Sequence, residues 1–271
     1  MHDRWIFTAP IPEPDVRVDY GDDPFQFAEL RLPKGHASKS SSVPVVIGIH
    51  GGYWMAQFGL DYFTHLCADL TAGGVATYCI EYRRLGNRGG GWPGTFLDVA
   101  ASADHLRALA SEYNLDLGRV TAIGHSAGGH LALWLAARRR IDRQSVLYSD
   151  NPLTIGKAIS LAGVNDLYEC WEKGLCENVV ENFLAGSPAS RPERYKAASP
   201  AALLPLGVKQ ILFHGNDDQL VPLSLSANYY RAATGKGDNC SFKVLPGAGH
   251  FEVVDPKSPE WETIRYAVLA E

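Results

Sequence analysis

The sequence has no excess of positive charge. Its 25 Lys and Arg residues are outnumbered by 30 Asp and Glu residues, which gives a formal net charge of −5. A broad nucleic-acid surface needs a clear basic excess, because it must neutralise many phosphates. The composition therefore argues against nucleic acid as a partner and leaves only a local basic patch open.

Long apolar runs are also missing. No stretch approaches the roughly 18 to 20 apolar residues that a membrane-spanning helix needs. The first residues, Met1 to Trp5, place no apolar run behind a basic start, so no signal peptide is visible. We expect a cytoplasmic protein with no membrane partner, although a chain that had already lost a targeting segment would look the same.

Cysteines are few and odd in number, and no CxxC pair is present for zinc binding or thiol exchange. The five are Cys67, Cys79, Cys170, Cys176 and Cys240. We expect reduced thiols, since Cys170 and Cys176 would form a disulfide only in an oxidising compartment. No grouping of His, Cys and carboxylate residues has metal-ligand spacing, so neither a metal nor another cofactor is expected.

The rest of the composition is that of an ordinary globular chain. The 271 residues are 46% hydrophobic and 20% charged, which suits a fold with a sizeable core. We expect a single domain over residues 1–271.

The apolar runs predict a sheet covered by helices. Two runs at the start, Val16–Tyr20 and Gln26–Leu32, are joined by turn residues and predict an antiparallel hairpin. After them, apolar runs of strand length alternate with helical patterns, which is typical of an α/β fold with a mostly parallel central sheet and helices on both faces. The strands predicted in this part are Val43–Ile49, Val75–Tyr82, Val120–Ile123, Lys157–Leu161, Gln210–Phe213 and Ser241–Leu245.

Two segments add detail to this pattern. A long helix is predicted over Thr95–Tyr113, where Thr95 and Asp98 have the spacing of a capping box. The stretch Leu167–Leu206 breaks the alternation of strand and helix and contains several Gly and Pro residues. We interpret residues 167–206 as a small cap or lid inserted into the domain.

The strongest local signal is the pentapeptide at the junction between a predicted strand and a predicted helix, Gly124-His125-Ser126-Ala127-Gly128. This context is typical of a nucleophile elbow, in which a strained turn raises the serine oxygen above the sheet. The small residues at 124 and 128 let neighbouring backbone pass. The alternative interpretation is a glycine-rich helix start capped by Ser126.

A second motif follows the first central strand, His50-Gly51-Gly52-Tyr53-Trp54. Acyl transfer develops an oxyanion, which needs backbone N–H donors that are fixed in advance. One donor follows the nucleophile and another comes from the loop after this earlier strand. We expect Gly52, Tyr53 and Ala127 to form the oxyanion hole and His50 to order the loop. An ordinary Gly-Gly turn is the alternative.

Two later loops supply candidates for a base and its carboxylate. Each follows a predicted strand, and their sequences are His214-Gly215-Asn216-Asp217-Asp218 and Gly247-Ala248-Gly249-His250-Phe251. A serine needs a base within reach, and the base needs an orienting carboxylate. Ser126, Asp218 and His250 follow the chain order of serine, acid and histidine that this fold uses. Asp217 competes with Asp218, and one of the two aspartates is expected to be only a turn residue.

Weaker signals surround these motifs. A glycine-rich basic loop, Arg83–Gly94, has no Gly-Lys-Ser/Thr and is not a phosphate loop. As a loop at the carboxyl edge of the sheet it is expected to border the substrate, with a flexible connection as the alternative. Aromatic residues near the motifs are expected to bind substrate as a wall, with core packing as the alternative. They are Tyr53, Trp54, Trp92, Tyr168 and Trp171.

From about Val16 to its end, the chain resembles α/β-hydrolases of the esterase/lipase group with an HGG-type oxyanion loop. The motif at 50–54, together with the octapeptide GHSAGGHL at 124–131, resembles kynurenine formamidase (arylformamidase) and related small carboxylesterases. In such enzymes the segment HG-x-x-D-x-x-VP carries the acid at its D, which implies Asp218 here. One departure is Tyr53, which stands where related esterases have a third glycine and implies a narrower acyl pocket.

These observations predict a serine hydrolase that cleaves small carboxylic esters or aryl formamides through an acyl-enzyme. A general short-chain carboxylesterase and an acyltransferase are the alternatives. A peptidase is disfavoured because the chain lacks the large extra domain of prolyl-oligopeptidase-like enzymes. A non-catalytic ligand-binding homologue is disfavoured because all three triad candidates are present. The sequence does not indicate the oligomeric state.

Overall fold

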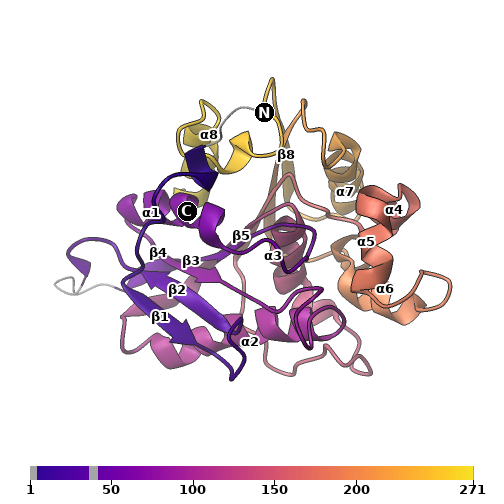
Figure 1. Ribbon diagram of the computed structural model, residues 1–271, viewed down its shortest axis with the longest axis horizontal. Coiled ribbons are helices and arrows are strands. Elements are labelled where there is room, and N and C mark those ends of the chain that lie inside the picture. The colour runs from indigo at the N-terminus through magenta and orange to yellow at the C-terminus, as the bar shows by residue number, and fades with distance from the viewer. Residues whose placement is uncertain (1–4, 37–41, 271) are drawn as a thin grey trace.

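The computed structural model describes residues 5–36 and 42–270 (Figure 1). Residues 1–4, which make up most of the stretch considered for targeting, lie outside the described residues.

One mixed sheet of eight strands forms the centre of the molecule, in the order β1-β2-β4-β3-β5-β6-β7-β8. The hairpin of β1 and β2 is antiparallel, and β2 also pairs antiparallel with β4. All other neighbours are parallel. The strands are β1 Val16–Asp19, β2 Phe27–Arg31, β3 Val43–Ile49, β4 Ala76–Ile80, β5 Leu115–His125, β6 Lys157–Leu161, β7 Lys209–Gly215 and β8 Cys240–Leu245. The predicted α/β-hydrolase fold with its N-terminal hairpin is confirmed.

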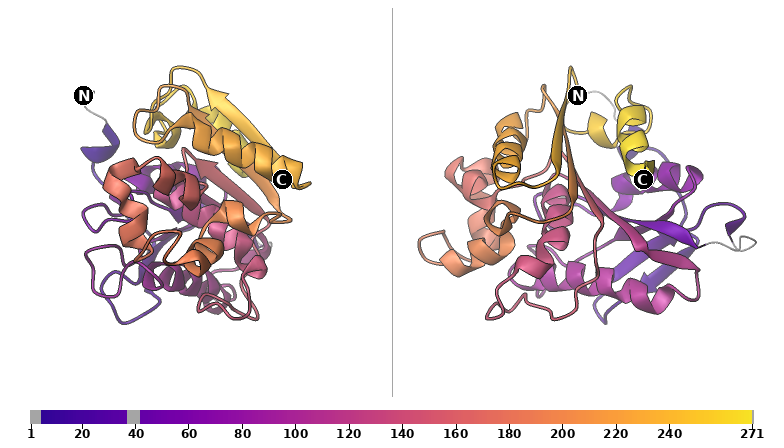
Figure 2. Two further views of the ribbon diagram at one scale, coloured as in Figure 1. Left: turned by 90° about the vertical axis from the view of Figure 1, so that its right-hand side faces the viewer. Right: turned by 180° about the vertical axis from the view of Figure 1, so that it is seen from behind.

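Helices cover both faces of this sheet (Figure 2). They are α1 Thr64–Ala72, α2 Gly94–Leu109, α3 Ala127–Ala137, α4 Leu167–Glu172, α5 Leu175–Phe183, α6 Pro192–Ala198, α7 Leu223–Gly235 and α8 Trp261–Leu269. Short 3-10 turns include η1 Trp5–Phe7, η3 Asp61–Phe63 and η5 Pro200–Leu203. Helices α1 and α8 lie together on one face, whereas α2, α3 and α7 pack on the other.

The central strands are buried on both sides, as their continuous apolar runs predict. Val46 and Ile123 belong to the core beneath α1 and α8. Their chain neighbours Ile47 and Ala122 belong to the core beneath α2 and α3. Because successive side chains of a strand point to opposite faces, one run of apolar residues fills both cores. All four residues are at most 2% exposed.

The segment predicted as a cap forms α4, α5 and α6 between β6 and β7. These helices gather at the side of the molecule opposite to β1 (Figures 1 and 2). The carbonyl oxygen of Phe183, at the end of α5, accepts the N–H of Trp92 at 2.8 Å. The segment is therefore attached to the glycine-rich loop that precedes α2.

The capping box predicted at the start of α2 is wrong. The helix begins at Gly94, and its first residues receive no side-chain cap. Asp98 instead forms two hydrogen bonds with the guanidinium of Arg83, of 2.8 and 2.7 Å. Thr95 donates its hydroxyl to the carbonyl of Arg83. Both side chains therefore hold the loop before the helix rather than the helix end.

Two further features bear on the sequence predictions. Each of the five cysteines is a free thiol, with Cys170 buried and Cys176 exposed. Within residues 5–36 and 42–270, no helix combines the length and the apolar character needed to cross a bilayer.

Candidate active site

Ser126 occupies a sharp turn between β5 and α3. Its backbone has φ 57° and ψ −119°, and a positive φ at a residue other than glycine persists only where the surroundings enforce it. The N–H of Ser126 donates to the carbonyl oxygen of Leu161 on β6 at 2.8 Å, and α3 begins at the next residue. The strained strand-to-helix turn predicted at 124–128 is therefore present.

The glycines on either side of Ser126 are required by the lack of space. A Cβ at Gly124 would lie 2.0 Å from the carbonyl oxygen of Gly128, and a Cβ at Gly128 would lie 2.0 Å from that of Ile49. These neighbours are backbone atoms, which cannot rotate away as a side chain can. The two glycines let β5, α3 and the end of β3 meet around the serine.

Gly128→Ala is expected to lower the free energy of unfolding by about 3 kcal/mol, because the added methyl overpacks a site bounded by backbone. Chemical denaturation measures this loss. The matched control is Gly235→Ala at the end of α7, where a Cβ would meet nothing within 4 Å. Equal stability of the two variants would contradict the expectation.

Asp218 and His250 form a buried pair in the loops after β7 and β8. His250 Nδ1 lies 2.6 Å from Asp218 Oδ2. The backbone N–H groups of Leu220 and Val221 donate to the other carboxylate oxygen at 2.8 and 2.9 Å. The Asp218 side chain has no exposed surface, whereas Asp217 is an exposed turn residue. Of the two competing aspartates, Asp218 is the one that contacts the histidine.

The carboxyl group of Asp218 is held in its charged form. Burial alone would raise its pKa, but the hydrogen bonds with His214 and His250 and the N–H of Val221 outweigh burial and lower the pKa well below its ordinary value. His214 Nε2 is 3.2 Å from the same Oδ2 that contacts His250. Two histidines therefore share one carboxylate oxygen.

His250 lies directly beside the residue that precedes Ser126. Its ring centroid is 4.5 Å from that of His125, and its carbonyl oxygen accepts the Nε2–H of His125 at 2.8 Å. Within the described residues, the hydroxyl of Ser126 is not hydrogen-bonded to His250.

The HGG loop lies against Ser126. A Cβ at Gly51 would lie 2.9 Å from the Cβ of Ser126, so only glycine fits there. The N–H of Gly51 donates to the hydroxyl oxygen of Tyr62 at 2.7 Å. Within the described residues, the backbone N–H groups of Gly52 and Tyr53 donate to no acceptor. These two groups are available as donors, as the oxyanion-hole prediction requires.

His50 connects this loop to the end of β4, in line with its predicted role. It is fully buried, its Nε2 lies 3.0 Å from Glu81 Oε1, and its ring stacks on Tyr82 at 4.5 Å between centroids. The Tyr82 hydroxyl donates to the carbonyl oxygen of His50 at 2.9 Å. Arg84 Nη1 lies 3.1 Å from the same Glu81 oxygen. A buried charged network therefore holds the loop to the end of β4.

The aromatic residues predicted to bind substrate differ in their burial. Trp54 has no exposed surface and stacks on Phe183 at 4.5 Å between ring centroids. It is a core residue, because the cap segment covers it, so the prediction that its ring faces a substrate is not supported. Trp92, Tyr168 and Trp171 are half-buried, and their role in binding stays a prediction.

Sequence reasoning missed the residues that support the pair and the loop. They are Glu81, Tyr62, Asn165 and Ser226, together with a role for His214. Glu81 carried a signal, since a charged residue directly after a buried strand lies at the edge of the sheet where sites form. The other residues contact partners that are distant in the sequence, so no local pattern indicates their roles.

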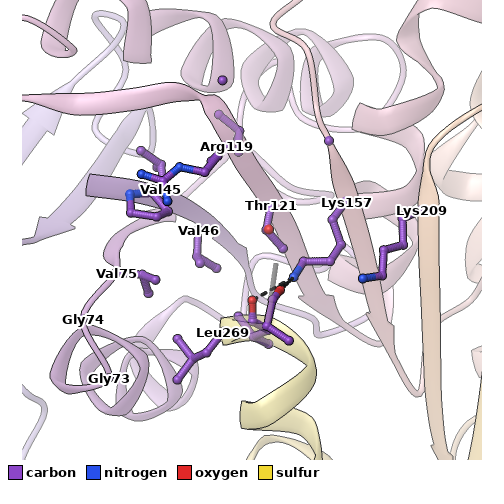
Figure 3. A pocket seen from close by; sticks show the side chains of 16 residues that line it. Val45, Val46, Gly73, Gly74, Val75, Arg119, Thr121, Lys157, Lys209 and Leu269 are labelled. Atoms are coloured by element: carbon purple, nitrogen blue, oxygen red, sulfur yellow. Dashed lines mark hydrogen bonds between the residues drawn. The ribbon is translucent and has the colours of Figure 1, made fainter. Parts of the chain in front are cut away.

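A cavity of about 590 Å³ lies at the opposite edge of the sheet, among the first residues of several parallel strands (Figure 3). Lys157 lines it and donates from Nζ to the carbonyl oxygens of Ala267, Val268 and Ala270 at 3.0, 2.9 and 2.6 Å. Burial, together with nearby Lys209, lowers the pKa of Lys157 to about 8. This lysine caps the end of α8 and takes no part in the serine site.

The combination of this sheet with a strained serine after β5 and a buried Asp–His pair after β7 and β8 is that of the α/β-hydrolases. A family model agrees with the class. The BD-FAE model matches residues 30–232, which is more than half of the chain. The chain belongs to the BD-FAE family, an esterase group with the α/β-hydrolase fold.

Individual relatives are more distant. A probable isoprenylcysteine alpha-carbonyl methylesterase from Oryza sativa subsp. japonica is 26% identical over 253 residues, 87% of this chain and 58% of the relative. Kynurenine formamidase from Danio rerio is 25% identical over 244 residues, 88% of this chain and 75% of the relative. This chain spans 58% of the length of that methylesterase and 50% of the length of a related probable methylesterase from Arabidopsis thaliana.

A solved structure extends the likeness to the fold. Esterase B from Lactobacillus rhamnosis superposes with a TM-score of 0.80 and 21% identity, covering 97% of this chain and 87% of that chain. At this identity, the likeness concerns the fold alone.

Proposed function

We propose that the protein is a serine hydrolase that cleaves small carboxylic esters, with aryl formamides as the second candidate class of substrate. The observation that carries the proposal is the strained Ser126 beside the buried Asp218–His250 pair. The esterases and formamidases among the relatives support it.

In this mechanism, His250 acts as the base. Its Nδ1–H donates to Asp218, so its Nε2 carries the lone pair that takes the proton from Ser126. The serine oxygen attacks the carbonyl carbon, and the N–H groups of Gly52, Tyr53 and Ala127 stabilise the oxyanion. The intermediate collapses to an acyl-enzyme as His250 returns the proton to the leaving alcohol or amine. Water, activated by the same histidine, then releases the acid.

The side chain of Tyr53 supports a small acyl group. Its hydroxyl donates to the carbonyl oxygen of Leu220, in the loop after β7, at 2.8 Å. Tyr53 itself belongs to the loop after β3, and β5 and β6 lie between β3 and β7 in the sheet. The ring therefore extends across the carboxyl ends of the strands near Ser126 and takes up space that a long acyl chain would need.

A substrate series tests the proposal. We expect kcat/KM to fall at least tenfold from p-nitrophenyl acetate to p-nitrophenyl octanoate. A tenfold fall corresponds to a loss of about 1.4 kcal/mol in transition-state binding. N-formyl-kynurenine in the same assay compares the formamide with the esters, and competing alcohols detect acyl transfer. No hydrolysis of any of these compounds would contradict the proposal, and a preference for octanoate would contradict the small pocket.

A further inference from the structure

Two other histidines lie beside the Asp218–His250 pair, and both are buried. His214 Nε2 is 3.2 Å from the Asp218 oxygen that contacts His250. The ring of His125 packs against that of His250. If His214 took up a proton, a second cation would compete with His250 for the single carboxylate. The site therefore needs a reason for His214 to stay neutral.

A chain of hydrogen bonds supplies that reason. The hydroxyl of Ser160 donates to Asn165 Oδ1 at 2.7 Å, and Asn165 Nδ2 donates to Ser226 Oγ at 3.2 Å. Ser226 Oγ accepts from the amide and still has its own O–H to donate, and His214 Nδ1 lies 2.8 Å from this oxygen. At the other side of the ring, Nε2–H donates to the carbonyl oxygen of Val221 at 2.9 Å. When the serine O–H is donated to Nδ1, the ring carries its proton on Nε2 alone.

Burial makes this direction of donors hard to reverse. Ser160, Asn165, His214 and Ser226 all have no exposed surface. A proton on Nδ1 of His214 would have to face the oxygen of Ser226 and leave the serine O–H without an acceptor. An unpaired buried donor costs about 1 to 3 kcal/mol, so the uncharged ring is favoured.

The same arrangement recurs at His125. Gly51 N–H donates to the oxygen of Tyr62, so the Tyr62 O–H points to His125 Nδ1 at 2.8 Å. The opposite ring nitrogen donates to the carbonyl oxygen of His250. Burial, and then the neighbouring His250, lower the pKa of His125 well below its ordinary value. Each histidine beside the pair thus faces a hydroxyl donor at Nδ1, whereas His250 faces the carboxylate there.

We infer that Ser226 is a positioning residue, which keeps His214 uncharged so that Asp218 balances the charge of His250 alone. The inference rests on the proposed hydrolase mechanism. The titratable groups that face His214 are Asp218, His250 and His125. Its neighbours from α7 and from the loop after β6, Ser226 and Asn165, are neutral.

Ser226→Ala tests the inference through the pH dependence of kcat/KM. Without the hydroxyl, Nδ1 of His214 can take a proton, and nearby Asp218 stabilises the resulting cation. We expect the acidic limb to move to higher pH by about one unit, since an opposite charge at this distance shifts a pKa by 1 to 3 units. Because two cations beside one carboxylate oxygen repel each other, the limb should also become broader than that of the wild type. At alkaline pH the variant should approach the wild type.

Three comparisons make the result specific. Ser224 lies on the same helix as Ser226, and its hydroxyl contacts Glu169 and no histidine. The pH profile of Ser224→Ala should therefore match that of the wild type. Ser226→Cys keeps a weaker donor, and its acidic limb should lie between those of the wild type and Ser226→Ala. Thermal unfolding shows whether each variant is folded. An unchanged acidic limb in folded Ser226→Ala would overturn the inference.

A second measurement separates this inference from the hydrolase proposal. The ring nitrogens of ¹⁵N-labelled histidines report protonation by NMR without any turnover. His214 Nδ1 should stay unprotonated through the acidic limb in the wild type and become protonated in Ser226→Ala. Failure of a fluorophosphonate to label Ser126 would reject the hydrolase, whereas labelling together with an unprotonated His214 in Ser226→Ala would reject only the role of Ser226.

Discussion

Replacement of Ser126 by alanine is expected to lower kcat by roughly 10⁴- to 10⁶-fold and to leave the fold intact. The loss is large because no other group takes over the covalent step. The fold survives because, within the described residues, the serine hydroxyl has no hydrogen bond, and alanine tolerates the turn as serine does. The free energy of unfolding should change by no more than about 0.5 kcal/mol.

Steady-state kinetics with p-nitrophenyl acetate measures the loss, and denaturation measures the stability. Ser224→Ala serves again as the control, since it removes a serine hydroxyl on α7 from a contact with Glu169. Turnover by Ser126→Ala near the wild-type rate would show that another residue attacks the substrate.

Asp218→Asn is expected to lower kcat about 10⁴-fold, the size of loss seen when a serine protease loses its triad aspartate in this way. The carboxylate oxygen Oδ1 accepts two backbone N–H groups, so the asparagine oxygen should stay there. Its NH₂ group would then face His250 Nδ1, which would have to accept a hydrogen bond. The ring proton would move to Nε2, and no lone pair would remain to take the proton of Ser126.

The same substitution should also reduce stability, because the NH₂ group would meet the N–H of His214. An unsatisfied donor of this kind costs about 1 to 3 kcal/mol. Asp217→Asn is the matched control, since that side chain is exposed, and it should alter kcat by less than about twofold. A large loss in Asp217→Asn with full activity in Asp218→Asn would reverse the assignment of the two aspartates.

The lowered pKa of Asp218 decides which group can cause a loss of activity at mildly acidic pH. Because it lies well below its ordinary value, the carboxylate remains charged at the mildly acidic pH at which an imidazole takes up a proton. A loss of activity in that range therefore comes from a histidine and not from Asp218. Because of this separation, a change in the acidic limb can be assigned to a histidine.

Much of the fold could be predicted from local patterns. The residues of β6 are all buried, and those of β3 are buried except for the partly exposed Pro44, as expected of strands covered on both sides. The turn at Ser126 was also predictable, because strand, glycine, serine and helix follow one another directly. The choice between Asp217 and Asp218 was different, since spacing alone left both open and the resemblance pointed to Asp218.

The remaining features depend on contacts between distant segments. Trp54 stacks on Phe183, which lies 129 positions later in the sequence, and no local pattern distinguishes such a core tryptophan from one that faces a ligand. The capping-box pattern at Thr95 and Asp98 was outweighed by Arg83, whose guanidinium pairs with Asp98. The hydrogen bonds from Ser160 to His214 join β6, the loop after it, α7 and β7, so sequence spacing gives no sign of them.

The position of β8 at the rim of the sheet has a consequence for how activity is gained and lost. Only β7 pairs with it, and His250 follows its last residue by five positions. A strand at the edge of a sheet pairs with one neighbour only, so its detachment breaks fewer backbone hydrogen bonds than that of an inner strand. Detachment of β8 would carry the histidine away while the serine turn, in the middle of the sheet, kept its shape. The proposed catalysis therefore requires β8 to be paired with β7, whereas the turn at Ser126 does not depend on that pairing.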